Sequence, residues 1–320
     1  MSLHGRRVFS MRKVATVFGG DGFIGRQVVQ RLAREDYVVR VATRDPMGAQ
    51  GMHTMGRVGQ IAGLVADVTD EAAVVRAVEG AAVVVNCVGI LHGNFTVVQA
   101  EGPGRIGRIA AAAGVERVVH ISAIGADASS PSAYARSKAE GEAALLAAFP
   151  KATILRPSIV FGENDRFFNR FAQMAMVLPF MPVIHGGTKF QPVHVGDVAQ
   201  AVMAALAEPA TEGRIYELGG PRVWTFRELM AFVVKETGRN RRLVNIPAGL
   251  AAFQARLGEL LPDPPLTRDQ LMLLQKDNVV ASGALTLGDL GVTPSAVEAL
   301  VPPYLSRFQV GGARRVRPAM

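Results

Sequence analysis

The sequence predicts an α/β protein, a doubly wound parallel sheet with a smaller C-terminal lobe. Through the first half of the 320 residues, short runs rich in β-branched residues alternate with longer amphipathic segments. The short runs are apolar throughout, as expected of parallel strands that helices cover on both faces. After about residue 160 the pattern changes to helix-like segments containing aromatic, Met and Pro residues. The alternation is typical of βαβ units, and the later change indicates a separate lobe.

Six apolar runs are predicted as strands of one sheet. They are residues 13–18, 37–43, 60–66, 81–88, 116–122 and 152–158. Segments 23–35 and 132–147 have the spacing of amphipathic helices and lie between predicted strands. Two later extended pieces, 189–195 and 213–220, are candidates to return to the same sheet.

A glycine-rich turn directly follows the first predicted strand. The stretch Gly-Gly-Asp-Gly-Phe-Ile-Gly lies between this strand and an amphipathic helix. Glycines there allow a tight turn, let a pyrophosphate approach the backbone and let the helix pack on the strand, and the free N–H groups at the helix start meet the phosphate charge. The alternative is a glycine turn without a ligand. We predict a Rossmann-type dinucleotide site that includes Gly19, Gly22, Phe23, Ile24 and Gly25.

The end of the second strand distinguishes NADP(H) from NAD(H). Arg44 stands nineteen residues after Gly25, where the side chain that contacts the adenosine ribose is expected. A guanidinium can hold a 2′-phosphate through paired hydrogen bonds, so the sequence favours NADPH/NADP over NAD. The next residue, Asp45, either opposes this choice or only forms a turn.

Two further strand ends are predicted to contact the same nucleotide. Asp67 and Val68 follow the third strand and would edge and cover an adenine, although Asp67 is equally explained as a helix cap. Val88 and Gly89 end the fourth strand, where a glycine lets the middle of the cofactor lie against the backbone. The alternative for this pair is an ordinary turn at the end of a strand.

The predicted elements divide the chain into two parts and two ends. We expect an NAD(P)-binding Rossmann domain at 11–160 completed by 185–220, a small lobe or lid formed by 161–184 and 221–310, and flexible basic ends at 1–10 and 311–320.

Composition limits the classes of function and partner. The formal net charge of +8 is concentrated at both ends and at 239–242, which fits an acidic protein partner, an anionic lipid surface or a solvated surface without a partner. No recognition motif accompanies the charge, so we expect no nucleic acid partner. One cysteine, Cys87, excludes an internal disulfide, and no apolar run reaches the ~18 residues of a membrane span. His185 and His194 lack a second ligand at metal spacing, so we expect no metal site.

These features together resemble the short-chain dehydrogenase/reductase superfamily in its extended or atypical branch. The matching pieces are the glycine turn, Ser122 after the fifth strand, Tyr134 and Lys138 in YARSK, LRPSIVFG at 155–162 and VHVGDVA at 193–199. A narrower resemblance lies in GFIGR, YARSKAEGE, RPSIVFGENDRFFNRFA, QPVHVGDVAQAV and PPLTRDQ. This combination is similar to the nucleotide-binding accessory subunits of respiratory complex I, NADH:ubiquinone oxidoreductase, and their bacterial relatives.

The superfamily resemblance assigns candidate roles at the reaction site. Tyr134 would pass a proton to a substrate carbonyl while NADPH delivers hydride, and Lys138, one helical turn away, would lower the pKa of the phenol and bind the nicotinamide ribose. Ser122 would bind the substrate oxygen, or is a strand-end hydroxyl satisfied by the backbone. The same Tyr–Lys pair also serves as a cofactor clamp without turnover. The family pattern further places three residues against the nicotinamide amide: Pro157, Ser158 and Ile159.

The narrower resemblance implies a specific cellular role. We expect an NADPH-binding accessory subunit of complex I whose nucleotide is structural or redox-sensing, without turnover of its own. Such a subunit would lie peripherally on the cytoplasmic face of a bacterial inner membrane, or on the matrix face if mitochondrial. Its partners would be complex I subunits, with an anionic lipid surface or quinone as further contacts. The apolar segment 163–183 leaves one alternative, a free-standing NADPH-dependent reductase or epimerase for an apolar carbonyl or quinone-like substrate. A third possibility is a sensor of the NADPH/NADP ratio.

Overall fold

The computed structural model describes residues 12–250, 256 and 267–310. Its centre is a parallel seven-stranded sheet with the strand order β11-β6-β5-β4-β1-β2-β3. The strands are β1 (Val14–Phe18), β2 (Val38–Thr43), β3 (Ile61–Val65), β4 (Val83–Asn86), β5 (Arg117–Ile121), β6 (Thr153–Pro157) and β11 (Ile215–Leu218). The predicted fold class is therefore confirmed, and the strand order reverses beside β1, where dinucleotides bind in such sheets.

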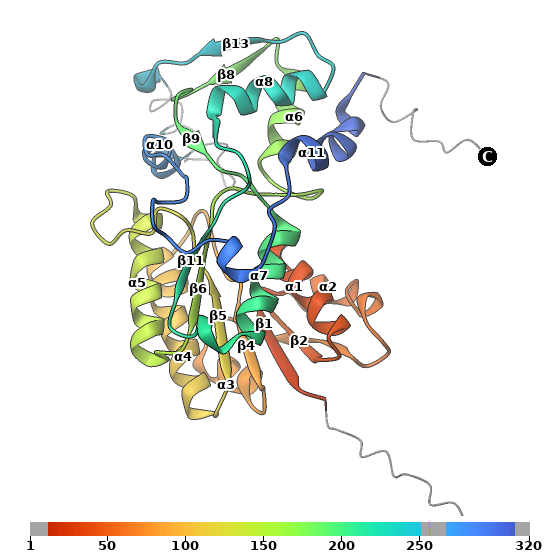
Figure 1. Ribbon diagram of the computed structural model, residues 1–320, viewed down its shortest axis with the longest axis vertical. Coiled ribbons are helices and arrows are strands. Elements are labelled where there is room, and N and C mark those ends of the chain that lie inside the picture. The colour runs from red at the N-terminus through yellow and green to blue at the C-terminus, as the bar shows by residue number, and fades with distance from the viewer. Residues whose placement is uncertain (1–11, 251–255, 257–266, 311–320) are drawn as a thin grey trace, which may run out of the picture.

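Helices cover both faces of this sheet. One face packs against α1 (Phe23–Arg34), α2 (Pro46–Gln50) and α7 (Val195–Ala207). The other packs against α3 (Glu71–Val78), α4 (Gly102–Ala112) and α5 (Ala133–Ala148). The central strands are buried on both sides, which explains their unbroken apolar sequences. Figure 1 shows the strands of the seven-stranded sheet running towards the lobe, so their carboxyl ends face it.

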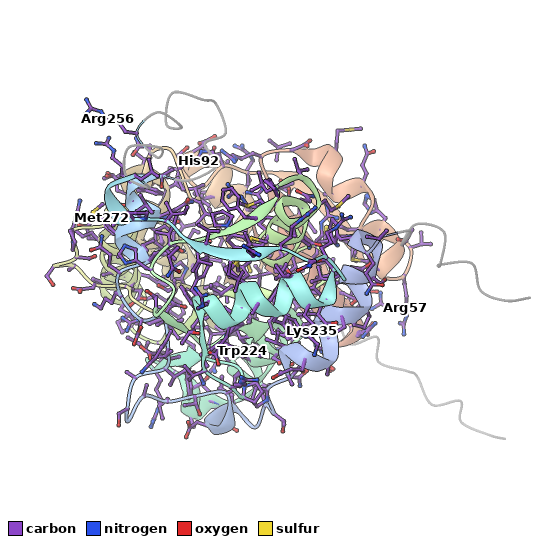
Figure 2. The ribbon with its side chains drawn as sticks, turned by 90° about the horizontal axis from the view of Figure 1, so that it is seen from above. Arg57, His92, Trp224, Lys235, Arg256 and Met272 are labelled. Carbon is purple, nitrogen blue, oxygen red and sulfur yellow. The ribbon has the colours of Figure 1, made fainter. Side chains whose placement is uncertain are left out.

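The lobe has its own aromatic core. Its main elements are α6 (Phe168–Val177), β8 (Phe180–Val183), α8 (Phe226–Glu236), β13 (Arg242–Asn245), α10 (Arg268–Leu273) and α11 (Val297–Leu305). Figure 2 looks down on this lobe, with Trp224 just before α8 and Met272 on α10. Phe161, Phe168 and Phe226 are buried in its core. Most aromatic residues of the expected lid segment therefore pack inside the lobe, while Val177 and Phe180 are exposed.

One strand prediction is wrong. Residues 189–195 do not join the main sheet but form β9 (Lys189–Phe190) and β10 (Val193–His194). These short strands pair with β12 (Trp224–Thr225) and β7 (Val160–Phe161), respectively, in separate two-stranded sheets, and β8 pairs with β13 in a third. The other returning piece, 213–220, supplies β11 and does join the main sheet beside β6.

The shorter helical turns complete the described chain. They are the 3-10 turns at His53–Met55, Pro209–Thr211, Gly288–Leu290 and Ser306–Phe308 and a π-helical segment, η2, at Thr96–Glu101. The chain after α10 returns to the main sheet, because Leu287, Leu290 and Val292 lie in the core that also contains β1 and α1. The predicted domain limits stay a prediction, and the ends at 1–10 and 311–320 lie outside the described residues.

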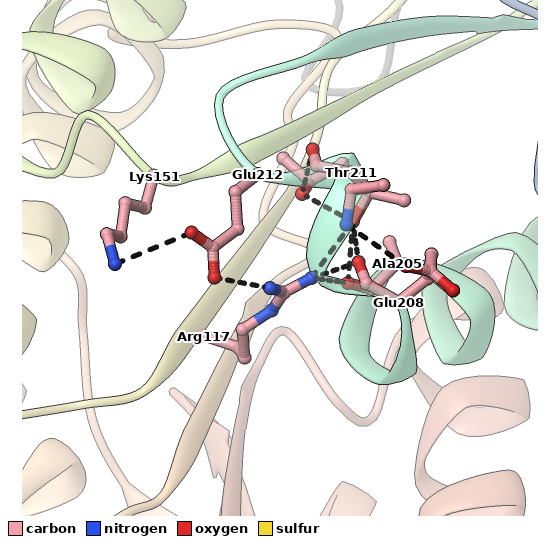
Figure 3. Close-up of polar contacts among 8 residues, drawn as sticks. Arg117, Lys151, Ala205, Glu208, Thr211 and Glu212 are labelled. Atoms are coloured by element: carbon pink, nitrogen blue, oxygen red, sulfur yellow. Dashed lines mark hydrogen bonds and ion pairs between the residues drawn. The ribbon is translucent and has the colours of Figure 1, made fainter.

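A half-buried arginine fastens β11 to the rest of the nucleotide domain. Arg117, at the start of β5, donates hydrogen bonds to Glu212 Oε1 at 2.6 Å, Thr211 Oγ1 at 2.9 Å and the carbonyl oxygens of Ala205 and Glu208 (Figure 3). Lys151 also pairs with Glu212, at 3.5 Å. The contacts hold the turn between α7 and β11 against the edge of the sheet, which fixes where β11 adds to β6.

None of the described helices is long and apolar enough to cross a bilayer.

Candidate functional site

The glycine turn has the geometry of a phosphate cradle. Gly19 has a φ of +67°, a left-handed conformation that favours glycine. A Cβ on Gly25 would lie 2.1 Å from the Gly19 carbonyl oxygen, so only glycine lets α1 start this close to the turn. Gly22 is the N-cap of α1 without a side-chain cap, and the first turn of the helix contains no acid. The N–H groups of Gly19 and Gly22 already donate to the carbonyl oxygens of Ala42 and Gly19. The amides at the helix start, those of Phe23 and Ile24, are suited to bind the pyrophosphate of a dinucleotide.

Arg44, which is predicted to contact the adenosine end of the nucleotide, directly follows β2. Its side chain is exposed and makes no hydrogen bond or ion pair with any residue that the structure describes. Asp45 has a separate role, because its carboxylate accepts the Met47 N–H at 2.9 Å as the N-cap of α2. The interpretation of Asp45 as a turn residue is thereby supported, and the contact of Arg44 with a ribose phosphate stays a prediction.

The loop after β3 places Asp67 and Val68 beside the same edge of the sheet. Asp67 Oδ1 accepts the Thr69 N–H at 2.8 Å, whereas the N-cap of α3 is Asp70. The alternative that Asp67 caps this helix is therefore wrong. Val68 is 4% exposed and packs near Gly102, so its contact with an adenine stays a prediction.

The fourth strand ends next to the candidate acid–base pair. Gly89 is exposed, and a Cβ there would lie 3.4 Å from Lys138 Nζ. The Val88 N–H bonds to Asn86 Oδ1 at 3.0 Å, and the following amide, of Ile90, bonds to Gln99 Oε1 at 2.9 Å. Gly89 therefore leaves backbone surface open directly beside the ammonium.

Two side chains on β5 and at its end are buried without a partner. Ser122 Oγ and both ring nitrogens of His120 make no hydrogen bond with the described residues, although the two side chains are only 4% and 1% exposed. The alternative that the backbone satisfies the Ser122 hydroxyl is thus wrong. Because a buried polar atom without a partner costs about 1–3 kcal/mol, a bound group that supplies one would be favoured here. This hydroxyl without a described partner fits a bound ligand at the end of β5.

Tyr134 and Lys138 lie one turn apart on α5. Lys138 Nζ is 5.9 Å from the centroid of the Tyr134 ring and donates to the Ile121 carbonyl oxygen at 3.3 Å. Phe95 packs edge-on against the Tyr134 ring, with centroids 6.1 Å apart. The predicted one-sided arrangement is present, and the structure brings the Lys138 ammonium to the carboxyl end of β5, at the residue before Ser122.

The electrostatics of this pair differ from the expectation. Burial lowers the pKa of Lys138 to about 8, against the opposing charge of Glu142. The pKa of Tyr134 is raised to about 12, mainly by burial and then by the charge of Asp269. The expectation of a lowered phenol pKa is therefore wrong for this arrangement, because desolvation of the phenolate and the charge of Asp269 both raise it.

The residues at the end of β6 and just after it contact the lobe. The Ser158 hydroxyl donates towards two oxygen atoms of Asn278, Oδ1 at 2.7 Å and the carbonyl oxygen at 2.9 Å. It also accepts the Gln191 N–H at 3.2 Å. Pro157 is buried and Ile159 is half-buried. The Ser158 hydroxyl therefore contacts the lobe, and the contact of Pro157, Ser158 and Ile159 with a nicotinamide stays a prediction.

Three polar residues at this site were missed by sequence reasoning. Asp269 and Asn278 come from the lobe, and Gln99 comes from η2. Asp269 belongs to the PPLTRDQ stretch that resembles the complex I subunits, which was its only signal. Gln99 links the fourth strand to α5, because Nε2 donates to Ser137 Oγ at 3.1 Å.

A metal centre finds no support in the described ranges. No three His, Cys, Asp or Glu side chains among them gather closely enough to hold a metal ion. His194 instead accepts the Gly196 N–H through Nδ1 and caps α7, as expected of a structural histidine.

Comparison with known proteins decides the family. Residues 15–219 match the model of the NAD dependent epimerase/dehydratase family. The chain belongs to this family. The match covers β1 to β11, the span that contains the glycine turn and the Tyr–Lys pair, so the fold is that of NAD(P)-dependent proteins. The predicted membership of an extended dehydrogenase/reductase branch is confirmed.

Relatives of this epimerase/dehydratase member include respiratory chain subunits. The chain is 33% identical over 304 residues to NADH dehydrogenase (ubiquinone) 1 alpha subcomplex subunit 9 of Dictyostelium discoideum, covering 92% of this chain and 85% of the relative. It is 35% identical over 316 residues to the protein of that name from Arabidopsis thaliana, covering 93% and 79%. A ceramide reductase of Caulobacter vibrioides is 30% identical over 243 residues, covering 74% of each chain. The narrower resemblance, to the family of these complex I subunits, is therefore confirmed.

Solved structures of other proteins share the fold. An NADPH-dependent quinone oxidoreductase of Escherichia coli complexed with NADPH superimposes with a TM-score of 0.73 at 24% identity, covering 92% of this chain and 99% of the other. A dTDP-glucose 4,6-dehydratase of Streptomyces venezuelae with bound NAD gives 0.70 at 19% identity, covering 92% and 96%. At these identities the likeness establishes the fold alone.

Proposed function

We propose that this chain is an NADPH-binding accessory subunit of respiratory complex I, with the nucleotide in a structural or redox-sensing role. The observation that carries the proposal is the extent of the likeness to complex I subunits, which runs over 304 residues and so includes the lobe as well as the nucleotide domain. A generic nucleotide-binding fold requires no such similarity in the lobe. The proposed partners are complex I subunits, and the proposed location is peripheral, on the cytoplasmic face of a bacterial membrane or the matrix face of a mitochondrial one.

The choice of NADPH rests on Arg44. Its exposed guanidinium makes no bond with the described residues, while the neighbouring carboxylate of Asp45 is engaged in capping α2. Paired, charge-assisted hydrogen bonds to a 2′-phosphate would then favour NADP(H). The amides of Phe23 and Ile24 at the start of α1 would hold the pyrophosphate, and Lys138 would bind the nicotinamide ribose. When bound, the nicotinamide supplies a hydride donor.

A holding role also fits the acid–base pair. With a pKa raised to about 12, the Tyr134 phenol is protonated at neutral pH, and the side chain is half-buried beside Phe95. Its hydroxyl can donate a hydrogen bond to the cofactor, as a clamp requires. A tightly held dinucleotide stabilises the folded chain, and the stabilisation grows with the logarithm of its concentration relative to Kd.

The assembly is tested by purification from its native membrane. A tagged chain is isolated in mild detergent, and the proteins and nucleotide that accompany it are identified by mass spectrometry. We expect complex I subunits and NADPH or NADP released on denaturation. Recovery of the chain alone from the soluble fraction would contradict the subunit role.

The nucleotide assignment is tested with Arg44→Ala. We expect NADPH binding to weaken by about tenfold or more and NADH binding to stay unchanged, because only NADPH carries the 2′-phosphate. Arg34→Ala is the matched control, since Arg34 is an exposed arginine at the far end of α1. Fluorescence titration measures both affinities, and an equal loss for the two nucleotides would refute the assignment.

A second function is favoured by one comparison. The ceramide reductase relative at 30% identity supports the alternative of an NADPH-dependent reductase for an apolar carbonyl. Incubating the purified chain with NADPH and a dispersed long-chain ketone, the 3-oxo form of ceramide, tests this directly: hydride would pass to the carbonyl carbon and a proton to its oxygen, and the loss of NADPH absorbance reports the turnover. Turnover that disappears in Tyr134→Phe would support the reductase and oppose a purely holding role.

A further inference from the structure

A strap from the lobe, defined here as residues 267–278, reaches the carboxyl ends of the central strands. Its first contact is Asp269, in the first turn of α10. The Asp269 carboxylate accepts hydrogen bonds from Ala133 N at 2.7 Å, Ser132 Oγ at 2.8 Å and Tyr134 N at 3.4 Å. These donors form the start of α5, more than 130 residues earlier in the chain. One carboxylate of the lobe therefore binds the helix that carries the candidate Tyr–Lys pair.

The start of α5 is a favourable place for this charge. The amides of the first turn carry partial positive charge and lack partners within the helix. The first turn of α5 contains no acidic residue, and its N-cap is Ser132, whose hydroxyl accepts the Ala135 N–H. Asp269 supplies from the lobe the anion that the helix does not have. Loss of this contact would leave at least one helix amide, that of Ala133, without its described partner.

The strap has a second attachment nine residues later. Asn278 Nδ2 donates to the Ile124 carbonyl oxygen at 3.0 Å, and Asn278 accepts the Ser158 hydroxyl. Ile124 follows β5 and Ser158 follows β6. The strap thus spans the ends of α5, β5 and β6, and both attachments lie beside residues predicted to contact the nicotinamide half of the nucleotide.

We propose that Asp269 is a positioning residue that couples docking of the lobe to nucleotide binding. The proposal rests on the proposed function, because it requires a nucleotide held by α5. A nucleotide that binds Tyr134 and Lys138 orders the first turns of α5, and an ordered first turn presents the donors that hold Asp269. By thermodynamic reciprocity, a docked lobe then tightens nucleotide binding by the same factor. The nucleotide state would in this way reach the lobe and any partner bound to it.

The test compares Asp269→Asn with Asp277→Asn in the full chain. Asp277 is the matched control, because it is an aspartate of the same strap whose Oδ1 accepts the Lys189 N–H at 2.8 Å, away from α5. NADPH affinity is measured by fluorescence titration, and exchange of α10 amides is measured by hydrogen–deuterium exchange with and without NADPH. We expect NADPH to slow α10 exchange in wild type and in the control. In Asp269→Asn we expect about tenfold weaker NADPH binding and loss of this protection.

Two further variants separate positioning from general stability. Asp269→Glu keeps the negative charge and is expected to regain most of the lost affinity. Titration of the four tyrosines by NMR, assigned with Tyr134→Phe, is expected to show a lower pKa for the Tyr134 phenol in Asp269→Asn and an unchanged one in Asp277→Asn. If Asp269→Asn weakened NADPH binding only by destabilising the fold, the pKa of Tyr134 would be the same as in wild type.

The possible results distinguish failure of the proposed coupling from failure of the proposed function. If wild type binds NADPH but Asp269→Asn has the same affinity and the same α10 protection, the coupling is refuted and the proposed function stands. If wild type binds no NADPH, the proposed function itself fails and the inference fails with it. Equal effects of Asp269→Asn and Asp277→Asn would also overturn the specific role of Asp269.

Discussion

Substitution of Gly25 by alanine is the sharpest test of the phosphate cradle. The new Cβ would lie 2.1 Å from the Gly19 carbonyl oxygen and 2.6 Å from Gly20 Cα, whereas ordinary contacts begin at 3.4 Å. The start of α1 must therefore move away from the turn by about 1 Å, against backbone atoms that cannot rotate aside. Overpacking of this size costs about 3 kcal/mol in the free energy of unfolding. For a domain of this size we expect Tm to fall by about 6–12 °C.

The same displacement should affect the nucleotide more than the fold. The α1 amides would no longer converge on the pyrophosphate, and we expect NADPH binding to weaken by more than about tenfold. Urea unfolding followed by circular dichroism measures the stability, and fluorescence titration measures the affinity. Gly51→Ala is the control, because no atom lies within 4 Å of its added Cβ and its φ is −64°. A Gly25→Ala chain with the stability and NADPH affinity of wild type would refute the reasoning.

Two buried charged or titratable groups lead to further predictions. Burial and the charge of Lys138 lower the pKa of His120 to about 3. Unfolded histidine binds a proton near pH 6.5, so this group should cost up to about 1.4 kcal/mol of stability per pH unit as pH falls from 6.5 towards 3. His120→Leu should show a shallower loss of urea stability on acidification, and equal slopes would argue against a neutral buried imidazole. The second group is Glu142, whose carboxylate accepts two hydrogen bonds from Arg156 at 2.6 and 2.9 Å. The substitution Glu142→Gln should lower the free energy of unfolding by about 3 kcal/mol. The exposed Glu140→Gln on the same helix should change it by less than about 0.5 kcal/mol, and equal effects would contradict the importance of the pair.

Local signals in the sequence were sufficient for the sheet and the glycine turn. The strands β1, β2 and β4 to β6 are continuous apolar runs, and the turn after β1 has a spacing that few other structures require. Helix caps were harder, since Asp67 and Asp70 both precede α3 and only the backbone geometry selects Asp70. The partners of β9 and β10 depend on tertiary packing, which a two-residue strand does not encode.

The least predictable part of the site comes from distant segments. Asp269 contacts Ser132 across 137 positions of the chain, and no local periodicity indicates such a pairing. The pKa of Tyr134 was misjudged for the same reason, because burial and the lobe carboxylate both arise from chain segments that meet only in the folded protein. Sequence spacing therefore identified which residues share a helix face, but it did not determine their electrostatic surroundings.

The return of residues 287–292 to the central core has a consequence for biosynthesis. Leu287, Leu290 and Val292 complete the core around β1 and α1, although they are translated after α8 and α10. A ribosome-bound chain that has already exposed its glycine turn must therefore keep this core open until these residues have emerged. Full nucleotide affinity would then require synthesis beyond Val292, and a chain terminated earlier would present an unfilled apolar surface to chaperones and proteases before it reached any assembly.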